Sequence, residues 1–399
     1  MNKAKLVVLL TVLVGVIGIG VVIPVLPFYV ESFGVAPWVI TSLFAVFSLC
    51  AFFSTPFLGA LSDKIGRRPV LLISIASTAI GWIVFALAPS LIWLFVGRII
   101  DGLAAGNFST AQSSLVDLAK SPKERSTNLG LLGAIFGLGF ILGPMLGGLL
   151  SAISQSFPFW FVGGLSIINL ILAYRFLPET ISVKQKSQPL SFNPLVTISR
   201  SFKNKNLRPG FSAWFLFGLA DTTVSAVLAL YLAKIFGWGA TGVGLIMTGV
   251  GVVLAVNQGV ALKHFWLKYF AEPSLEVGML AIIAVGFLAM ALQNFWFFIL
   301  GLMLLTFGQS VLRVVMTSQI VGKSHPSQQG EVLGVLASIT SMAMVLGPLA
   351  SGFLFQLNPS LPYILGSLLA LIALTILAYY RSCFGKEKLP EDILIPPSV

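Results

Sequence analysis

The sequence predicts an all-α membrane protein with twelve transmembrane helices in two pseudo-symmetric six-helix bundles. Three observations support this prediction. Hydrophobic residues make up 57% of the 399 residues and charged residues only 9%. The mean hydropathy is +0.98, and the apolar residues fall into twelve long runs. A water-soluble globule needs more polar surface than this, so the composition excludes a large soluble enzyme.

Each run is long enough to cross the hydrocarbon core of a bilayer, which takes about 20 residues. The first run ends at Pro24 and Pro27 rather than at a small-residue cleavage site, so we expect a retained helix and not a signal peptide. The expected spans, in chain order, are 6–30, 39–61, 69–88, 91–117, 127–153, 159–177, 211–236, 242–262, 275–292, 295–321, 331–357 and 361–380.

The basic residues report the topology. The chain has 24 Lys and Arg against 13 Asp and Glu, which gives a formal net charge of +11. Nearly all of these bases fall in one set of loops and in the terminal segments, whereas the other set of loops holds Lys234 alone. By the positive-inside rule the first set and both termini are cytoplasmic. The charge is explained in this way, and we expect no nucleic-acid partner.

The chain divides into two related halves. We expect an N-terminal bundle at 1–180, a hydrophilic cytoplasmic linker at 181–208, a C-terminal bundle at 209–382 and a cytoplasmic tail at 383–399. A shift of 204 residues places Gly143-Pro144 on Gly347-Pro348 and Gly97 on Gly301. Such a repeat predicts two parallel bundles with a cavity between them near the middle of the bilayer.

A loop between the second and third spans contains Gly59, Asp63, Gly66, Arg67 and Arg68. It resembles the signature loop of the major facilitator superfamily. We expect Gly59 to permit close helix approach, Gly66 to permit a tight turn, and the bases to stay in the cytosol. A plain topology loop would need the charges but neither the glycines nor the aspartate.

The fifth span contains Gly139, Gly143, Pro144, Gly147 and Gly148. This arrangement is similar to the Gly-x-x-x-Gly-Pro-x-x-Gly-Gly motif of the antiporter branch of that superfamily. Glycines at four-residue spacing give a smooth helix face, and the proline predicts a kink. Ordinary packing of small residues explains the spacing but explains the complete motif less well.

Three further stretches resemble those of twelve-span drug:proton antiporters, among them the tetracycline-efflux proteins. They are residues 20–27, 117–125 and 329–331. The resemblance implies a pair between Asp117 and either Arg67 or Arg68 that forms when the cytoplasmic side is closed. Gly15 stands where tetracycline exporters usually carry an acidic residue, so tetracycline is not carried over as the substrate.

Ionisable residues inside spans are costly and tend to mark ion or substrate paths. Asp221 lies near the middle of the seventh span without an acid or base at helical spacing, as expected for a proton carrier. Arg98 and Asp101, in an element similar to the superfamily's Arg-x-x-Gln-Gly, are three residues apart and able to pair. That pair is either a fixed structural ion pair or a proton switch. For Arg313 we expect snorkelling toward the cytoplasmic face.

Polar and aromatic residues in the spans are candidates for the substrate cavity, because such groups suit an amphipathic organic ligand. They are Asn107, Gln112, Trp214, Asn257, Gln258, Phe307 and Gln309. We expect no metal site and no cofactor, because the two histidines fall in loops and no Cys/His cluster is present. Gly322-Lys323-Ser324 lacks the first glycine of a phosphate-binding loop, which argues against an ATP-driven pump.

These features predict a secondary transporter that exports small amphipathic compounds or drugs in exchange for protons. The expected partners are a small-molecule substrate, protons and membrane lipids, and we expect a monomer. The resemblance implies the bacterial inner membrane. One alternative is a proton symporter or a facilitator for a metabolite. A receptor or a membrane enzyme is the other, and nothing in the sequence indicates catalysis.

Overall fold

The computed structural model describes residues 3–119, 121–181, 206–324 and 329–384, together with residues 202 and 204. Within these residues the secondary structure is helical, and twelve helical segments are long and apolar enough to cross a membrane. The predicted fold class and the number of spans are therefore confirmed. The predicted linker at 181–208 and the tail at 383–399 lie almost wholly outside the described residues, so the bundle boundaries stay a prediction.

The N-terminal half has seven helices because its fourth span is broken in two. In chain order they are α1 (Lys3–Glu31), α2 (Pro37–Ile65), α3 (Arg67–Ala86), α4 (Leu91–Leu103), α5 (Asn107–Asp117), α6 (Pro122–Leu150) and α7 (Phe157–Phe176). α1 packs on α6 and α7, while α3 packs on α4 and α7. α1 is apolar on every face, which suits a helix enclosed by its neighbours.

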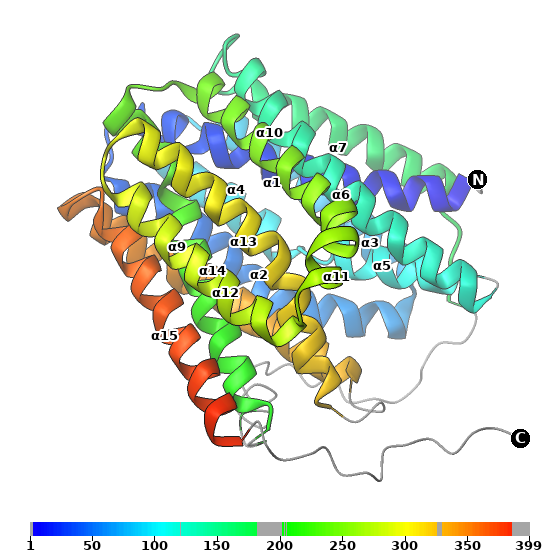
Figure 1. Cartoon of the computed structure of the whole chain (residues 1–399). Coiled ribbons are helices and arrows are strands. Elements are labelled where there is room, and N and C mark those ends of the chain that lie inside the picture. The colour runs from blue at the N-terminus through cyan, green and yellow to red at the C-terminus, as the bar shows by residue number, and fades with distance from the viewer. Residues whose placement is uncertain are drawn as a thin grey trace, which may run out of the picture.

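The C-terminal half repeats this plan, as Figure 1 shows. Its elements are α9 (Arg208–Phe236), α10 (Ala240–Val256), the π-helix η1 (Asn257–Trp266), α11 (Leu267–Tyr269), α12 (Glu272–Ala291), α13 (Phe295–Gly322), α14 (Gln329–Leu357) and α15 (Leu361–Phe384). α9 packs on α14 and α15, while α12 packs on α13 and α15. Each half thus has the same pairs of neighbouring helices.

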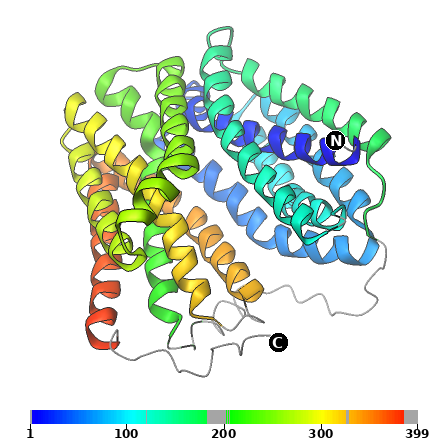
Figure 2. The ribbon, with the colours of Figure 1, turned by 45° about the vertical axis from the view of Figure 1, so that its right-hand side comes forward.

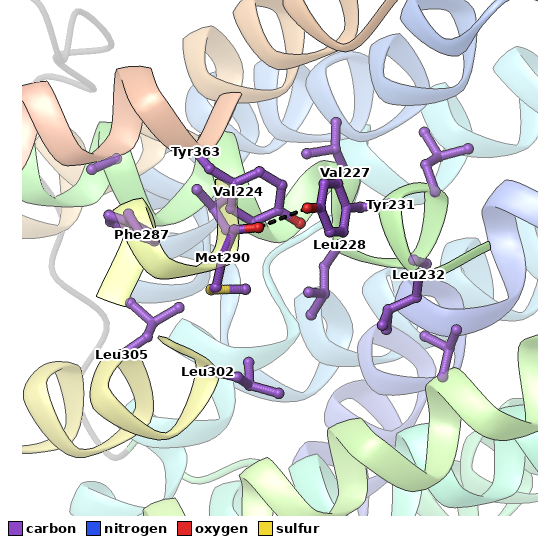
Figure 3. Packing of buried hydrophobic residues seen from close by; sticks show 14 of the residues in the cluster. Val224, Val227, Leu228, Tyr231, Leu232, Phe287, Met290, Leu302, Leu305 and Tyr363 are labelled. Atoms are coloured by element: carbon purple, nitrogen blue, oxygen red, sulfur yellow. Dashed lines mark hydrogen bonds between the residues drawn. The ribbon is translucent and has the colours of Figure 1, made fainter. Parts of the chain in front are cut away.

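A buried tyrosine repeats in the same way. The hydroxyl of Tyr29 donates to the backbone oxygen of Phe85, at the end of α3, over 3.2 Å. The hydroxyl of Tyr231 donates to the backbone oxygen of Met290, at the end of α12, over 2.7 Å (Figure 3). Both rings lie in the hydrophobic core, where a tyrosine hydroxyl needs a partner. The duplication is therefore visible in hydrogen bonds as well as in helix order.

The break in the fourth span was not predicted. α4 ends at Leu103 and α5 begins at Asn107, so carbonyl groups at the break lose their regular α-helical partners, and the Gly102 oxygen accepts from the Ala105 nitrogen over 3.2 Å. Hydroxyl groups of α2 take their place: Ser54 donates to the Gly102 oxygen over 2.7 Å, and Thr55 donates to the Ala105 oxygen over 2.9 Å. A break inside a membrane helix is tolerated when neighbours satisfy the freed backbone in this way.

The two halves contact each other mainly toward one end of the molecule. The other end carries Lys3, Arg67, Arg208 and Lys323, and we call it the basic end. The packing between halves pairs α6 with α10 and α2 with α14 (Figure 2). Their described polar and aromatic contacts, between residues 141–148 and 241–248 and between residues 38 and 353, lie toward the opposite end. The halves are thus held together away from the basic end.

Candidate functional site

An ion pair joins two membrane helices of the C-terminal half. Nη2 of Arg313, on α13, lies 2.7 Å from Oδ2 of Asp221, on α9. The side chain of Asp221 is 12% exposed and that of Arg313 is 42% exposed. Asp221 lies about 20 Å along α9 at 1.5 Å per residue, which is close to the middle of this 29-residue helix. The pair therefore places a carboxylate at mid-membrane depth with an accessible cation beside it.

Neighbouring residues hold Asp221 in place through α14. The hydroxyl of Thr222 donates to the backbone oxygen of Ala343 over 2.9 Å. Gly347 makes this approach possible, because a Cβ at that position would overlap the Thr222 side chain and would lie 2.9 Å from the Thr223 nitrogen. On the other side the Arg313 guanidinium lies 5.6 Å from the centroid of the Phe217 ring. The carboxylate is thus carried by a helix that cannot easily slide or rotate.

One prediction about this site is wrong, because Arg313 turns toward α9 instead of snorkelling to a membrane face. Asp221 has no acid or base at helical spacing on α9, as predicted, and its basic partner comes from α13. The two residues are 92 positions apart, so helical spacing along one span could not have found the pair. The available signal in the sequence was that the two residues lie at similar depth in the seventh and tenth spans. The sequence does not show how each helix is rotated about its axis, so it could not show that the two side chains face each other.

Arg98 and Asp101 lie within the N-terminal half and do not form the expected ion pair. Arg98 is 5% exposed, and its guanidinium lies 5.0 Å from the Trp82 ring centroid and 4.9 Å from that of Phe85. Its Nε and Nη2 atoms have no hydrogen-bond partner. Asp101 instead forms a hydrogen bond with Thr78 of α3. The two charges still interact electrostatically, but Arg98 packs on aromatic rings and Asp101 bonds to Thr78, so the side chains are not in direct ionic contact.

The predicted cavity residues separate into distinct groups. Asn257, Gln258 and Phe307 come together where η1 meets α13, because both amides donate to backbone or side-chain oxygens of α13. The indole of Trp214 donates to Thr340 of α14 over 2.9 Å. Asn107 donates to Thr78 over 3.0 Å, and the same hydroxyl serves Asp101. Gln112 is exposed and Gln309 is half-buried.

The glycine motif of α6 serves two interfaces. A Cβ on Gly139 would lie 2.7 Å from Val16, one on Gly143 would lie 2.7 Å from the Gly20 Cα, and one on Gly147 would lie 2.9 Å from the Val21 oxygen. These three glycines therefore seat α1. Gly148 instead faces α10 of the other half, whose Thr241 hydroxyl donates to the Gly148 oxygen over 2.9 Å.

Pro144, the proline of the motif, also lies at the contact between the halves. Gly244 of α10 approaches the Pro144 oxygen so closely that a Cβ there would lie 2.5 Å from it. Nothing in the sequence pointed to Gly244 beyond its small size. The motif thus forms one continuous small-residue surface that touches both its own half and the other half.

The signature loop forms a charged cluster at the basic end. Nη2 of Arg67 lies 2.6 Å from Asp63 Oδ1, and Nε lies 3.1 Å from Asp117 Oδ2. Arg68 donates to the backbone oxygen of Tyr174 over 2.7 Å. The structure contains an Arg67–Asp117 pair, as the resemblance implied, but the pair forms here with the halves joined away from the basic end and not with that end closed. Every residue of this cluster belongs to the N-terminal half, so the pair does not itself bridge the halves.

In this loop the prediction for Gly59 is wrong and the prediction for Gly66 is confirmed. A Cβ on Gly59 would meet no atom within 4 Å, so Gly59 makes no close helix contact here. Gly66 has a φ of +120°, as a tight turn requires, and a Cβ would also overlap the carboxylate of Glu179. Glu179 accepts from the Arg67 backbone nitrogen over 2.8 Å. Glu179, which follows the end of α7 in the chain, therefore caps the start of α3, a role that the sequence did not indicate.

The C-terminal half has a different charged cluster at the basic end. Arg381 of α15 pairs with Glu276 of α12, whose side chain is 4% exposed. Gln319 of α13 donates to Glu272 over 2.8 Å. Burial lowers the pKa of Lys323, an effect that the nearby Glu276 opposes. In this cluster the acids Glu272 and Glu276 lie at the start of α12, the third span of the half, and the base Arg381 comes from another helix. The arrangement at α3 is the opposite, because bases start that helix and the acids come from other elements.

No group of three or more His, Cys, Asp and Glu side chains in the described part of the chain is arranged to hold a metal ion. The chemistry available at mid-membrane depth is therefore ionic and hydrogen-bonding. A carboxylate can bind a proton or a cation, and the adjacent guanidinium competes for it.

Comparison with known proteins gives a consistent answer. The family model of the Major Facilitator Superfamily matches residues 8–273 and 210–393. The class C tetracycline resistance protein of Escherichia coli is 29% identical over 94% of this chain and 96% of its own length. The quinolone resistance protein NorA of Staphylococcus aureus (strain COL) is 28% identical over 91% and 92%. A crystal structure of the peptide transporter POT shares the fold, with a TM-score of 0.83 at 13% identity over 97% and 96%.

Proposed function

Because this chain belongs to the Major Facilitator Superfamily, we propose that it is a secondary transporter that exports small amphipathic compounds or drugs in exchange for protons. Relatives that match nearly its whole length are named for resistance to tetracycline and to quinolones. Export of a drug is the direct route by which a membrane transporter confers such resistance.

The Asp221–Arg313 pair carries the proposal. The carboxylate of Asp221 is nearly buried and can hold one positive partner at a time: Arg313, a proton or a cationic group of the substrate. Binding of a proton and binding of substrate then exclude each other, which is the requirement for exchange. Arg313 neutralises the carboxylate when both are absent, and when a proton or substrate displaces it the released guanidinium, whose side chain is 42% exposed, is open to hydration.

Arg98 and Asp101 serve the N-terminal half differently in this proposal. Arg98 is enclosed by aromatic rings of α3, and Asp101 is bound to Thr78 of the same helix. Neither contacts the other half. We therefore assign them a structural role, the fixing of α4 against α3, in place of the proton switch that the sequence left open.

Exchange also requires that the two halves rock about the site. The halves are joined through α6–α10 and α2–α14 away from the basic end. With the bases and both termini in the cytoplasm of a bacterial inner membrane, as the positive-inside rule indicates, this is the cytoplasm-facing arrangement of a monomer. Each charge that moves through 100 mV then supplies about 2.3 kcal/mol for export.

The charged cluster around Arg67 is assigned to gating. It joins the end of α2, the start of α3 and the end of α5 into one rigid corner. When the halves close at the cytoplasmic side, this corner is the surface that meets the C-terminal half. The Arg67–Asp117 pair would hold the corner in shape in both states.

A pH-dye assay in energised inverted membrane vesicles tests the proposal. A panel of lipophilic drugs, sugars and amino acids is added to vesicles that carry the wild type or Asp221→Asn. We expect at least one lipophilic drug to release protons through the wild type and not through the variant. Proton movement in the opposite direction would favour a symporter, and gradient-independent exchange would favour a facilitator. Drug-dependent proton release that survives in Asp221→Asn would contradict the role of Asp221.

A further inference from the structure

The eighth span has a backbone geometry that its counterpart lacks. α2 is an uninterrupted α-helix over Pro37–Ile65, whereas α10 passes at Asn257 into the ten-residue π-helix η1. π-helical turns are rare and concentrate at functional positions. The difference between these two related spans therefore needs an explanation in side-chain contacts.

The π geometry brings Trp266 and Asn257 onto one face. The Trp266 indole Nε1 donates to Asn257 Oδ1 over 2.9 Å, although the residues are nine positions apart. In an α-helix nine residues turn through about 900°, which places the ends on opposite faces. In a π-helix of about 4.4 residues per turn they turn through roughly 740°, which places them almost in line. An α-helical eighth span could not make this hydrogen bond.

Asn257 holds α13 with its other end. It is 2% exposed, and its amide nitrogen donates to the Ser310 hydroxyl and, over 3.5 Å, to the Phe307 oxygen. The neighbouring amide of Gln258 donates to the Ser310 backbone oxygen over 3.2 Å. Because the indole fixes the orientation of the Asn257 amide, its NH₂ group points at α13 and not away from it.

Ser310 is the anchor point for Arg313. The two residues are three positions apart on α13 and so share a face, one helical turn from each other. The rotation of α13 that satisfies the η1 amides also directs Arg313 toward Asp221 on α9. A displacement of α13 by about 1 Å at Ser310 would move Arg313 by nearly the same distance, because a single helical turn is stiff.

We propose that Asn257 and Trp266 are positioning residues, which set α13 through Ser310 so that Arg313 reaches the Asp221 carboxylate. The π-helix is the device that allows this chain of contacts. The proposal rests on the proposed role of Asp221 in proton exchange. It adds that the eighth span, which bonds to α13 at Ser310 and Phe307, controls how the pair responds to protons.

The test compares Trp266→Phe and Ser310→Ala with Arg313→Gln. Two pH profiles are recorded for each purified protein: drug-stimulated proton release in liposomes, and protonation of the Asp221 carboxyl by infrared difference spectroscopy, with Asp221→Asn as the reference. We expect both variants to shift both profiles in the same direction as Arg313→Gln, by at least half as much. Trp296→Phe is the matched control, because this 76% exposed indole lies at the other end of α13.

The double variant Trp266→Phe/Arg313→Gln separates positioning from a general structural role. If Trp266 acts through Arg313, the double variant has the pH profiles of Arg313→Gln alone. Additive shifts, or profiles unchanged in both Trp266→Phe and Ser310→Ala, would overturn the proposal. The infrared profile needs no transport, so positioning can stand even if Asp221→Asn still exchanges protons, in which case only the proposed function fails.

Discussion

The two halves share a plan of helices and differ in their charges. In the N-terminal half the membrane-embedded cation, Arg98, is stacked against aromatic rings and closed off from solvent. In the C-terminal half the membrane-embedded cation is Arg313, at a position not related to Arg98 by the repeat, and it is 42% exposed and bound to Asp221. At the basic end the charge order is also reversed between α3 and α12. The two halves share their packing and differ in their embedded charges, because only in the second half is the embedded cation in direct contact with a carboxylate.

The largest expected effect comes from the charged clusters at the basic end. Arg381→Gln leaves Glu276, whose side chain is 4% exposed, without its ion-pair partner and with the more distant ammonium group of Lys323 as its remaining nearby cation. Loss of one partner from a buried pair costs about 3–5 kcal/mol. Arg67→Gln leaves Asp63 and Asp117, which are 45% and 25% exposed and can be hydrated, so its cost should be smaller by about 2 kcal/mol. Thermal unfolding in detergent measures the loss of stability in each of the two variants, and equal losses would contradict the expected difference between them.

The second largest expected effect is a difference in stability between substitutions of Gly143 and Gly347, which the repeat places at equivalent positions. The three atoms nearest to a Cβ on Gly143 would all be backbone atoms of α1, the first of them the Gly20 Cα at 2.7 Å, whereas a Cβ on Gly347 would meet the side chain of Thr222 first and one backbone atom, the Thr223 nitrogen, at 2.9 Å. A backbone cannot move aside as a side chain can, so Gly143→Val should destabilise more than Gly347→Val, by about 3 kcal/mol against about 1–2. Gly137→Val, on the same helix with no atom within 4 Å of its Cβ, is the control and should be tolerated. The reverse order in the unfolding midpoints would refute this.

The aromatic enclosure of Arg98 predicts a smaller loss. Lysine cannot stack a planar group between Trp82 and Phe85, so Arg98→Lys should lose about 1–2 kcal/mol of stability. Because the N-terminal charges are assigned a structural role, the pH profile of transport should stay where it is in the wild type. Arg313→Lys is the comparison, and it should move that profile. A shift of the pH profile of transport in Arg98→Lys would instead indicate that the N-terminal half takes part in proton transfer.

The smallest expected effect is the pH dependence of Lys323. Burial lowers the pKa of its ammonium group below the ordinary value of 10.5. The unfolded chain therefore binds more protons, and the contribution of this group to stability increases as the pH rises toward 10.5. The difference in unfolding midpoint between wild type and Lys323→Gln should grow in favour of the wild type over that range. A difference that shrinks with rising pH would have the wrong sign.

The fold could be predicted from the sequence because hydropathy alone identifies long membrane helices. Two features of the backbone could not be predicted in this way. The break before Asn107 depends on hydroxyl groups of Ser54 and Thr55 on another helix, and the π-helix depends on a contact between Asn257 and Trp266 that has no counterpart in residue composition.

The candidate site was predicted in part. Asp221 stood out because an acid in a membrane span is costly. Its partner Arg313 did not, since helix spacing shows neighbours on one helix and says nothing of how two helices face each other. The opposite error arose with Arg98 and Asp101, whose favourable spacing is overridden by Trp82, Phe85 and Thr78 on α3.

The central claim is that the C-terminal half alone carries the exchanged proton. The most direct measurement is the number of protons released when a transported drug binds to the detergent-solubilised protein at equilibrium, followed with a pH dye. Wild type and Asp101→Asn should release protons on binding, and Asp221→Asn should bind without release. Release that persists in Asp221→Asn, or that is lost in Asp101→Asn while the drug still binds, would contradict the account.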